Sequence, residues 1–139
     1  LQPEGLEHQG LAGALKRQAE LLHLRHGLQI QSQLSEPTDL QEHARLALFR
    51  VGLEALRNVV RHANASRVGI RLGRAGSDLE LEVWDDGLGF EPEQERPQRL
   101  GLKVMRERML AVGGDLSVQS RPGRGTQVLA RLPWPTQPG

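Results

Sequence analysis

The chain has 139 residues, with 18 Lys and Arg against 17 Asp and Glu and a formal net charge of +1, which fits one domain. It contains no cysteine, so disulfide scaffolds, cysteine zinc sites, iron–sulfur clusters and thiol catalysis are excluded. The near-neutral charge and the scarcity of aromatics (two Trp, two Phe, no Tyr) argue against a nucleic-acid binder. No apolar run approaches the roughly 20 residues that cross a bilayer, and the start lacks both Met and a signal sequence. We therefore expect a fragment of a longer protein.

Hydrophobic spacing of three and four predicts helices over residues 10–25, 40–62 and 102–112. Alternation of apolar and polar residues predicts strands over residues 28–34, 68–72, 79–83, 116–118 and 126–132. Residues 91–98 contain no aliphatic or aromatic residue, so we expect residues 91–99 to be a mobile loop. Residues 133–139 are expected to be a frayed tail.

The order of these elements indicates the fold class. Strands grouped in hairpins do not make a doubly wound parallel sheet. We therefore predict an α/β (α+β) protein, a two-layer sandwich with three helices on one face of a mixed, mainly antiparallel sheet.

The long second helix carries a ladder of polar residues, Glu54, Asn58 and His62, at four-residue spacing. A carboxylate, an amide oxygen and a basic group on one surface, with Arg61 beside them, have the chemistry to hold a divalent cation and a phosphate. The ordinary alternative is a solvated helix face, on which His62 complements the helix dipole.

Three glycine-containing motifs follow, and each has an ordinary explanation. Asp85-Asp86-Gly87-Leu88-Gly89 follows a strand, where glycines permit a sharp turn or close approach to a ligand. Gly101-Leu102 opens the third predicted helix, whose free N–H groups would face an anion. Gly123-Arg124-Gly125-Thr126 lies in a hairpin loop.

Other enzyme classes find less support in the sequence. The phosphate-binding P-loop, the Gly-x-Ser-x-Gly elbow and the His-Glu-x-x-His zinc motif are all missing. A metal site built from histidines is disfavoured, because no carboxylate accompanies them at a familiar spacing; the histidines considered are His8, His23, His26 and His43.

Taken together and in this order, the four motifs resemble those of the ATP-binding catalytic domain of sensor histidine kinases. That domain belongs to the superfamily of gyrase, heat-shock chaperone, histidine kinase and mismatch-repair ATPases, whose ATP-binding fold is the Bergerat type. The ladder resembles the N box of these proteins, residues 85–89 the G1 box, Gly101-Leu102 the G2 box, and residues 123–126 the last nucleotide-contacting turn.

The resemblance extends to the nitrate-sensor-like subfamily. Its short ATP lid is similar to residues 91–99, and its Gly-Leu-x-x-Met-Arg-Glu-Arg run is similar to residues 101–108. Leu1-Gln2-Pro3 and Gly10-Leu11 resemble the segment before its first helix. Gln2 in place of the usual Arg, and Gly52-Leu53 before Glu54, are the departures.

The resemblance implies ATP and Mg²⁺ as ligands. Asn58 would coordinate Mg²⁺, Glu54 would act as general base toward the acceptor histidine, and Asp85 would accept a hydrogen bond from the adenine amino group. Asp85 would thereby select ATP over GTP. The resemblance also implies that the phosphates are contacted by Arg61, His62, Gly101 and Leu102. It implies that the adenine is surrounded by Gly87, Gly89, Gly125 and Thr126.

The resemblance also implies partners. Residues 1–9 would be the end of the linker from a dimerisation and phosphoacceptor domain, residues 10–133 the catalytic domain, and residues 134–139 a disordered tail. The phosphoryl group would pass to a histidine of that separate domain and then to a response regulator. The implied location is cytoplasmic, without contact to nucleic acid or membrane. The alternatives are an interaction module controlled by ATP occupancy (an anti-sigma-factor-like kinase or a pseudokinase) and a structural domain without ligand.

Overall fold

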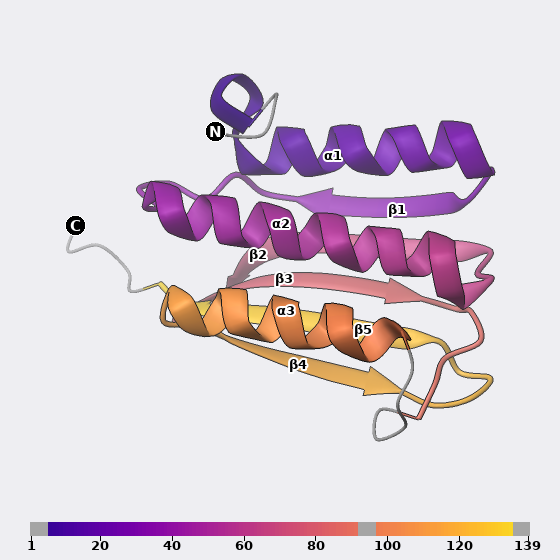
Figure 1. Ribbon diagram of the computed structural model, residues 1–139. Helices are drawn as coiled ribbons and strands as arrows, with labels where there is room; N and C mark the ends of the chain where they lie inside the picture. Colours follow the sequence, from indigo (N-terminus) through magenta and orange to yellow (C-terminus); the bar gives the residue numbers. More distant parts are fainter. Residues whose placement is uncertain (1–5, 92–96, 135–139) are drawn as a thin grey trace.

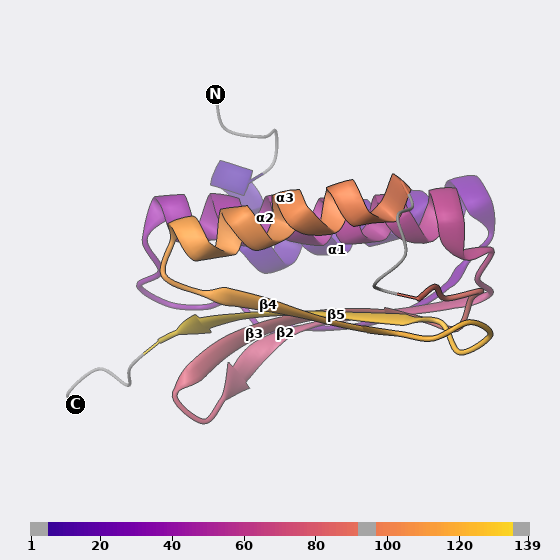
Figure 2. The ribbon, with the colours of Figure 1, turned by 60° about the horizontal axis from the view of Figure 1, so that its bottom comes forward.

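The computed structural model describes residues 6–91 and 97–134. Three helices cover one face of a five-stranded sheet whose strand order is β1-β2-β3-β5-β4 (Figures 1 and 2). Strands β1 and β2 are parallel, and every other neighbouring pair is antiparallel. The predicted two-layer sandwich is confirmed. Its elements are α1 (Leu6–His26), β1 (Gln29–Leu34), α2 (Glu42–Asn58), the π-helix η1 (Val59–Ala63), β2 (Arg67–Ala75), β3 (Asp78–Asp85), α3 (Pro97–Ala111), β4 (Asp115–Ser120) and β5 (Thr126–Pro133).

The core lies between the helices and the sheet. Burial alternates along β3, so that every second residue from Leu79 to Asp85 faces the helices. Met105 and Met109 of α3 are fully buried against this layer, as is Leu48 of α2. The apolar stripes read from the sequence therefore pack into one continuous core.

The first helix begins four residues earlier than predicted. Gly10 adopts φ 71° and ψ −178°, which kinks α1, and the backbone N–H groups of Leu11 and Ala12 donate to the Glu36 carboxylate at 3.0 and 2.7 Å. This carboxylate satisfies N–H groups left free by the kink. Leu6, ahead of the kink, is 2% exposed and belongs to the core. The assignment of residues 1–9 to a linker stays a prediction.

The second and third helices also differ from their predicted bounds. Helix α2 ends at Asn58 and continues as the π-helix η1, which Asn64 closes in the left-handed conformation. Helix α3 begins at Pro97, five residues before the predicted start, because proline is well suited to a first helical turn. Of the loop predicted over residues 91–99, residues 97–99 are therefore helical, and residues 92–96 lie outside the described residues.

The end of the chain is ordered further than predicted. Pro133 belongs to β5, and the Trp134 N–H donates to the Ser77 carbonyl at 2.8 Å. The Arg74 guanidinium lies 4.0 Å from the centroid of the Trp134 ring, a cation–π contact. Residues 135–139 of the predicted tail lie outside the described residues.

The face of the sheet opposite the helices carries no helix in the described parts of the chain (Figure 2). Across residues 6–91 and 97–134, no helix combines the length and apolar character that a membrane span requires.

Candidate functional site

The sequence-predicted motifs gather at one end of the sandwich. The ends of α2, β3 and β4 and the beginnings of α3 and β5 meet there, at the right-hand side of Figure 1. This arrangement follows from the topology, because β3 and β4 run in the same direction while β5 returns between them. The fold therefore brings together segments as far apart in the chain as the end of α2 and the beginning of β5.

Helix α2 presents Glu54 and Asn58 to the first turns of α3. A β-carbon added at Gly101 would stand 3.0 Å from Glu54 Oε1 and 3.4 Å from Asn58 Nδ2. Both side chains are half-buried. The ladder is therefore not a plain solvated helix face, since two of its members are half-buried and lie beside the open side of Gly101 in the G2-like motif.

Asp85 is the buried carboxylate at this end, with 9% exposure. Its Oδ1 accepts a hydrogen bond from the Gly87 N–H at 2.8 Å. Burial raises the pKa of this carboxyl above its ordinary value, and hydrogen bonds from the backbone of Gly87 and Thr126 oppose that rise. Among the described residues, no Lys, Arg or His side chain forms an ion pair with the Asp85 carboxylate.

The turn after Asp85 packs on the loop between β4 and β5. Gly89 and Gly125 have φ values of 64° and 73°. A β-carbon at Gly125 would overlap the Asp85 carbonyl oxygen, and one at Gly89 would overlap the Arg121 carbonyl oxygen. The N–H of Gly123 also donates to the Leu88 carbonyl at 2.6 Å. The two glycine motifs thus form one double loop, joined through close backbone contact.

Sequence reasoning missed Ser120, which holds this double loop together. Its hydroxyl accepts from the Phe90 N–H at 2.9 Å, donates to the Gly125 carbonyl at 3.0 Å, and lies 2.8 Å from Thr126 Oγ1. The side chain is buried. A serine before Arg-Pro-Gly reads as an ordinary turn residue, so the sequence carries no signal for this role.

Asp86, next to Asp85, has a different and structural role. Its Oδ1 accepts hydrogen bonds from the backbone N–H groups of Ser66 and Arg67, each at 2.9 Å. These bonds, with that from Arg67 first, lower the pKa of Asp86. Asp86 therefore fastens the beginning of β2 to the end of β3.

The remaining predicted site residues lie in different surroundings from those expected. His62 is half-exposed on the π-helix, and Arg61 lines a groove between α2 and α1, on the opposite side of α2 from α3. Leu102 is 7% exposed and belongs to the core. Gly101 and Leu102 are the fifth and sixth residues of α3. The sequence predicted free N–H groups at these two positions, but N–H groups beyond the first four of a helix are bonded within it.

The donor set fits a magnesium ion. Asn58 supplies an amide oxygen, and Glu54, one helical turn earlier, supplies a carboxylate that meets the same glycine. Mg²⁺ takes hard oxygen ligands and few of them from protein, retaining several waters. In the described residues, no group of three or more His, Cys, Asp or Glu side chains forms a fuller cage.

Comparisons with known proteins show the family to which the chain is similar. The family model described as "Histidine kinase-, DNA gyrase B-, and HSP90-like ATPase" matches residues 43–136. The sensor histidine kinase LiaS of Bacillus subtilis (strain 168) is 35% identical over 133 residues, which cover 96% of this chain and 37% of LiaS.

Solved structures show the same fold. The blue-light activated histidine kinase EL346 of Erythrobacter litoralis matches with a TM-score of 0.75 at 26% identity, over 91% of this chain and 42% of that one. Full-length ShkA in complex with AMPPNP matches with a TM-score of 0.74 at 24% identity, over 93% and 31%. The chain thus spans less than half the length of these three proteins.

The resemblance seen in the sequence is confirmed at the level of the family, while the nitrate-sensor-like subfamily stays a prediction. The matched residues include the N-box ladder and all three glycine motifs. The chain belongs to the family of histidine kinase-, DNA gyrase B- and HSP90-like ATPases.

Proposed function

We propose that this domain binds ATP with Mg²⁺ and positions the γ-phosphate for transfer to a histidine of a separate domain. The observation that carries the proposal is that Glu54 and Asn58 lie beside Gly101, where an added β-carbon would stand 3.0 and 3.4 Å from their polar atoms. This contact lies at the same end of the sandwich as the buried Asp85. One end of the fold thus combines a base-recognition group with phosphate-directed groups.

Asp85 would recognise the adenine. Its carboxylate keeps acceptor capacity beyond the bond from Gly87, and the exocyclic amino group of adenine is a donor. Guanine presents a carbonyl at that position, which would leave a buried carboxylate facing an unpaired acceptor. The domain would therefore prefer ATP to GTP.

Asn58 and Glu54 would serve the phosphate end. Asn58 would ligate Mg²⁺, which when bound neutralises phosphate charge and orients the triphosphate. The acceptor imidazole nitrogen attacks the γ-phosphorus, the bond to the bridging oxygen breaks, and ADP leaves. Glu54 accepts the proton from the acceptor imidazole or holds the imidazole in line. The role of the fold is mostly positioning.

The partners belong to the same proposal. The relatives are named as sensor kinases, as in LiaS, so the acceptor would belong to a dimerisation domain of the parent chain. The phosphoryl group would then pass to a response regulator. We place the domain in the cytoplasm, with no direct membrane or nucleic-acid contact, whether or not the parent is anchored.

The proposal is tested by phosphoryl transfer. The parent chain, or the domain mixed with its acceptor domain, would be incubated with radiolabelled ATP. Because a general base contributes about 10²- to 10⁴-fold, Glu54→Gln should lower the transfer rate by at least about 100-fold while leaving ATP affinity nearly unchanged. Glu20→Gln, an exposed site on α1, is the matched control.

The alternative is an interaction module that uses ATP occupancy to control docking. ATP binding without transfer in the wild-type parent chain would favour that module. Equal transfer in the wild type and Glu54→Gln would remove the role proposed for Glu54.

A further inference from the structure

A pocket lies on the face of the sheet that the helices leave uncovered. Val83 and Asp85 point toward the helices, so Trp84 between them points the other way. Register pairs Gly69 with Trp84, Trp84 with Gln127, and Gln127 with Gln119. These four residues therefore form one row across β2, β3, β5 and β4.

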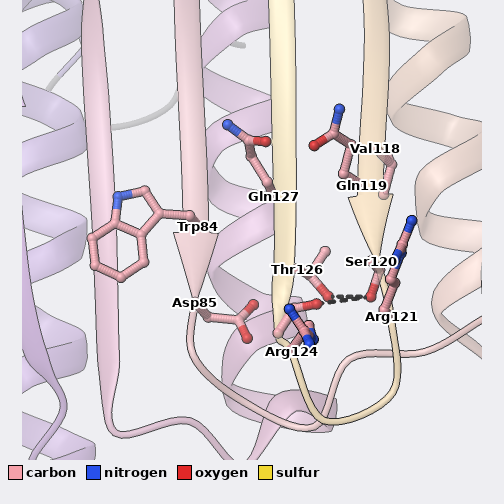
Figure 3. A pocket seen from close by; sticks show the side chains of 10 residues that line it. Trp84, Asp85, Val118, Gln119, Ser120, Arg121, Arg124, Thr126 and Gln127 are labelled. Atoms are coloured by element: carbon pink, nitrogen blue, oxygen red, sulfur yellow. Dashed lines mark hydrogen bonds between the residues drawn. The ribbon is translucent and has the colours of Figure 1, made fainter.

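The indole of Trp84 has a fixed place in this row. It lies across Gly69, where an added β-carbon would overlap the indole nitrogen. Figure 3 shows the ring extending over β2, with Gln127 and Gln119 on the neighbouring strands. The missing side chain at position 69 thus holds an apolar ring flat against the sheet.

The pocket has a volume of about 640 Å³. Trp84, Gln119 and Gln127 line it on the sheet face, and Arg121, Arg124, Asp85 and Thr126 line it where the strands end. This volume lies in the range of small-ligand and side-chain pockets. The two arginines come from the loop between β4 and β5, beyond the ends of these strands and to one side of the row (Figure 3). The pocket therefore joins an apolar surface to a cationic end.

The charge on this sheet face is unevenly compensated. Arg71 pairs with Glu80 at 2.8 Å and with Glu82 at 3.6 Å, and Arg131 pairs with Glu80 at 3.1 Å. Arg121 and Arg124 are exposed, and neither forms an ion pair with another residue of the described ranges. The cationic end is therefore available to an anionic partner.

We propose that this pocket binds an acidic peptide segment of a partner protein. Two carboxylates of the segment would meet Arg121 and Arg124, and an apolar side chain would pack on Trp84. Gln127 already donates its amide N–H to Glu82, so its amide oxygen is left to accept a peptide N–H. An inorganic anion would use only the arginines, whereas a peptide uses the ring and the amides as well.

The pocket shares Asp85 and Thr126 with the proposed adenine site. Arg121 and Arg124 belong to the loop that Ser120 and Gly123 fasten to residues 88–90. On the proposed function, this double loop surrounds the adenine. A bound peptide would then change ATP affinity, and ATP would change peptide affinity by the same factor.

The test uses Trp84 fluorescence. The chain has two tryptophans, so Trp134→Phe leaves Trp84 as the only emitter. This variant, without nucleotide, is titrated with the peptide Glu-Glu-Leu-Glu-Glu, capped at both ends, and with its Gln-Gln-Leu-Gln-Gln counterpart. We expect a saturable emission shift with the acidic peptide and at least tenfold weaker binding of the glutamine peptide.

Variants assign the effect to the pocket. Arg121→Gln with Arg124→Gln should weaken the acidic peptide at least tenfold, whereas Arg17→Gln, exposed on α1, should leave it unchanged. A thermal melt of each variant checks that it is folded. If the double variant bound the acidic peptide as tightly as the protein with both arginines, the proposal would be overturned. The same holds if citrate or an oligothymidylate bound as tightly as the acidic peptide.

Nucleotide is added only afterwards. A change in peptide affinity with ATP would support the coupling. Peptide binding without ATP binding would leave the pocket in place and remove the proposed function, so the two failures are distinguishable.

Discussion

The carboxylate of Glu54 lies against the backbone of Gly101, where a β-carbon would stand 3.0 Å from Oε1. Glycine in a helix interior costs about 0.5–1 kcal/mol relative to alanine. Its place in the second turn of α3 is therefore explained by the neighbouring side chains of α2 and not by helix formation.

Gly101→Ala should separate stability from activity. The free energy of unfolding should rise, by up to about 1 kcal/mol, because alanine favours the helix. Phosphoryl transfer should fall roughly tenfold to a hundredfold, because the added methyl displaces the Glu54 carboxylate.

Urea unfolding and transfer from radiolabelled ATP measure the two effects. Arg106→Ala, an exposed site on the same helix, serves as the control for helix propensity. Unchanged transfer in Gly101→Ala would show that the contact has no bearing on the reaction.

Gly125→Ala should destabilise the domain much more than Gly123→Ala. Both residues have positive φ, 73° and 79°, which costs a residue with a side chain about 1–2 kcal/mol. The β-carbon at position 125 would also overlap the Asp85 carbonyl, while position 123 has open space. Chemical denaturation should therefore give at least twice the loss for Gly125→Ala, and equal losses would contradict the double-loop packing.

Ser120→Ala should lower stability by about 1–3 kcal/mol, because the buried Phe90 N–H and Gly125 carbonyl both lose their partner. ATP affinity should fall with it, since the same loops surround the proposed adenine position. Ser117→Ala, exposed on the same strand, should change neither quantity. A Ser120→Ala variant with wild-type stability would rule out the fastening role.

Asp85 and Asp86 should affect the pH dependence of stability in opposite directions. Burial raises the pKa of Asp85 from 3.8, so its contribution is fully present below the unfolded pKa and is lost as pH rises through the folded pKa. Hydrogen bonds from the backbone of Arg67 and Ser66 lower the pKa of Asp86, so its contribution is present above the unfolded pKa and is lost as pH falls through the folded pKa.

Urea unfolding between pH 3 and 7 tests this pair. Relative to wild type, Asp85→Asn should gain stability as pH rises above about 4, and Asp86→Asn should lose stability over the range in which Asp86 ionises. Parallel curves for wild type and Asp85→Asn would show that the carboxyl of Asp85 is not perturbed.

The sequence correctly predicted the layers of the fold and the family, because these follow from hydrophobic periodicity and from the order of the motifs. The spacing of Phe49 and Leu56 and the alternation in β3 led to the correct layers, because burial alone decides those patterns. Element bounds were less well predicted. The start of α1 was missed because Leu6 packs into the core ahead of a kink, which is a tertiary contact. The start of α3 was missed because Pro97, a favourable first helical residue, lies in a charged stretch.

The site was predicted in its residues more than in its geometry. Glu54, Asn58 and Gly101 were chosen separately, and the structure brings them together. Arg61 was expected beside the ladder, yet it lines the groove toward α1 together with Arg57. Arg61 follows Arg57 by four residues and therefore shares its face of the helix. Ser120 has no sequence signal, since its partners are backbone groups of other segments.

Calorimetric titration with ATP and with GTP, in the presence of Mg²⁺, is the first test of nucleotide binding by this domain. We expect the domain to bind ATP in preference to GTP, Asp85→Asn to abolish this preference, and Asn58→Ala to make ATP binding insensitive to Mg²⁺. No ATP binding at millimolar concentration, or ATP binding that Asp85→Asn leaves unchanged, would contradict this expectation.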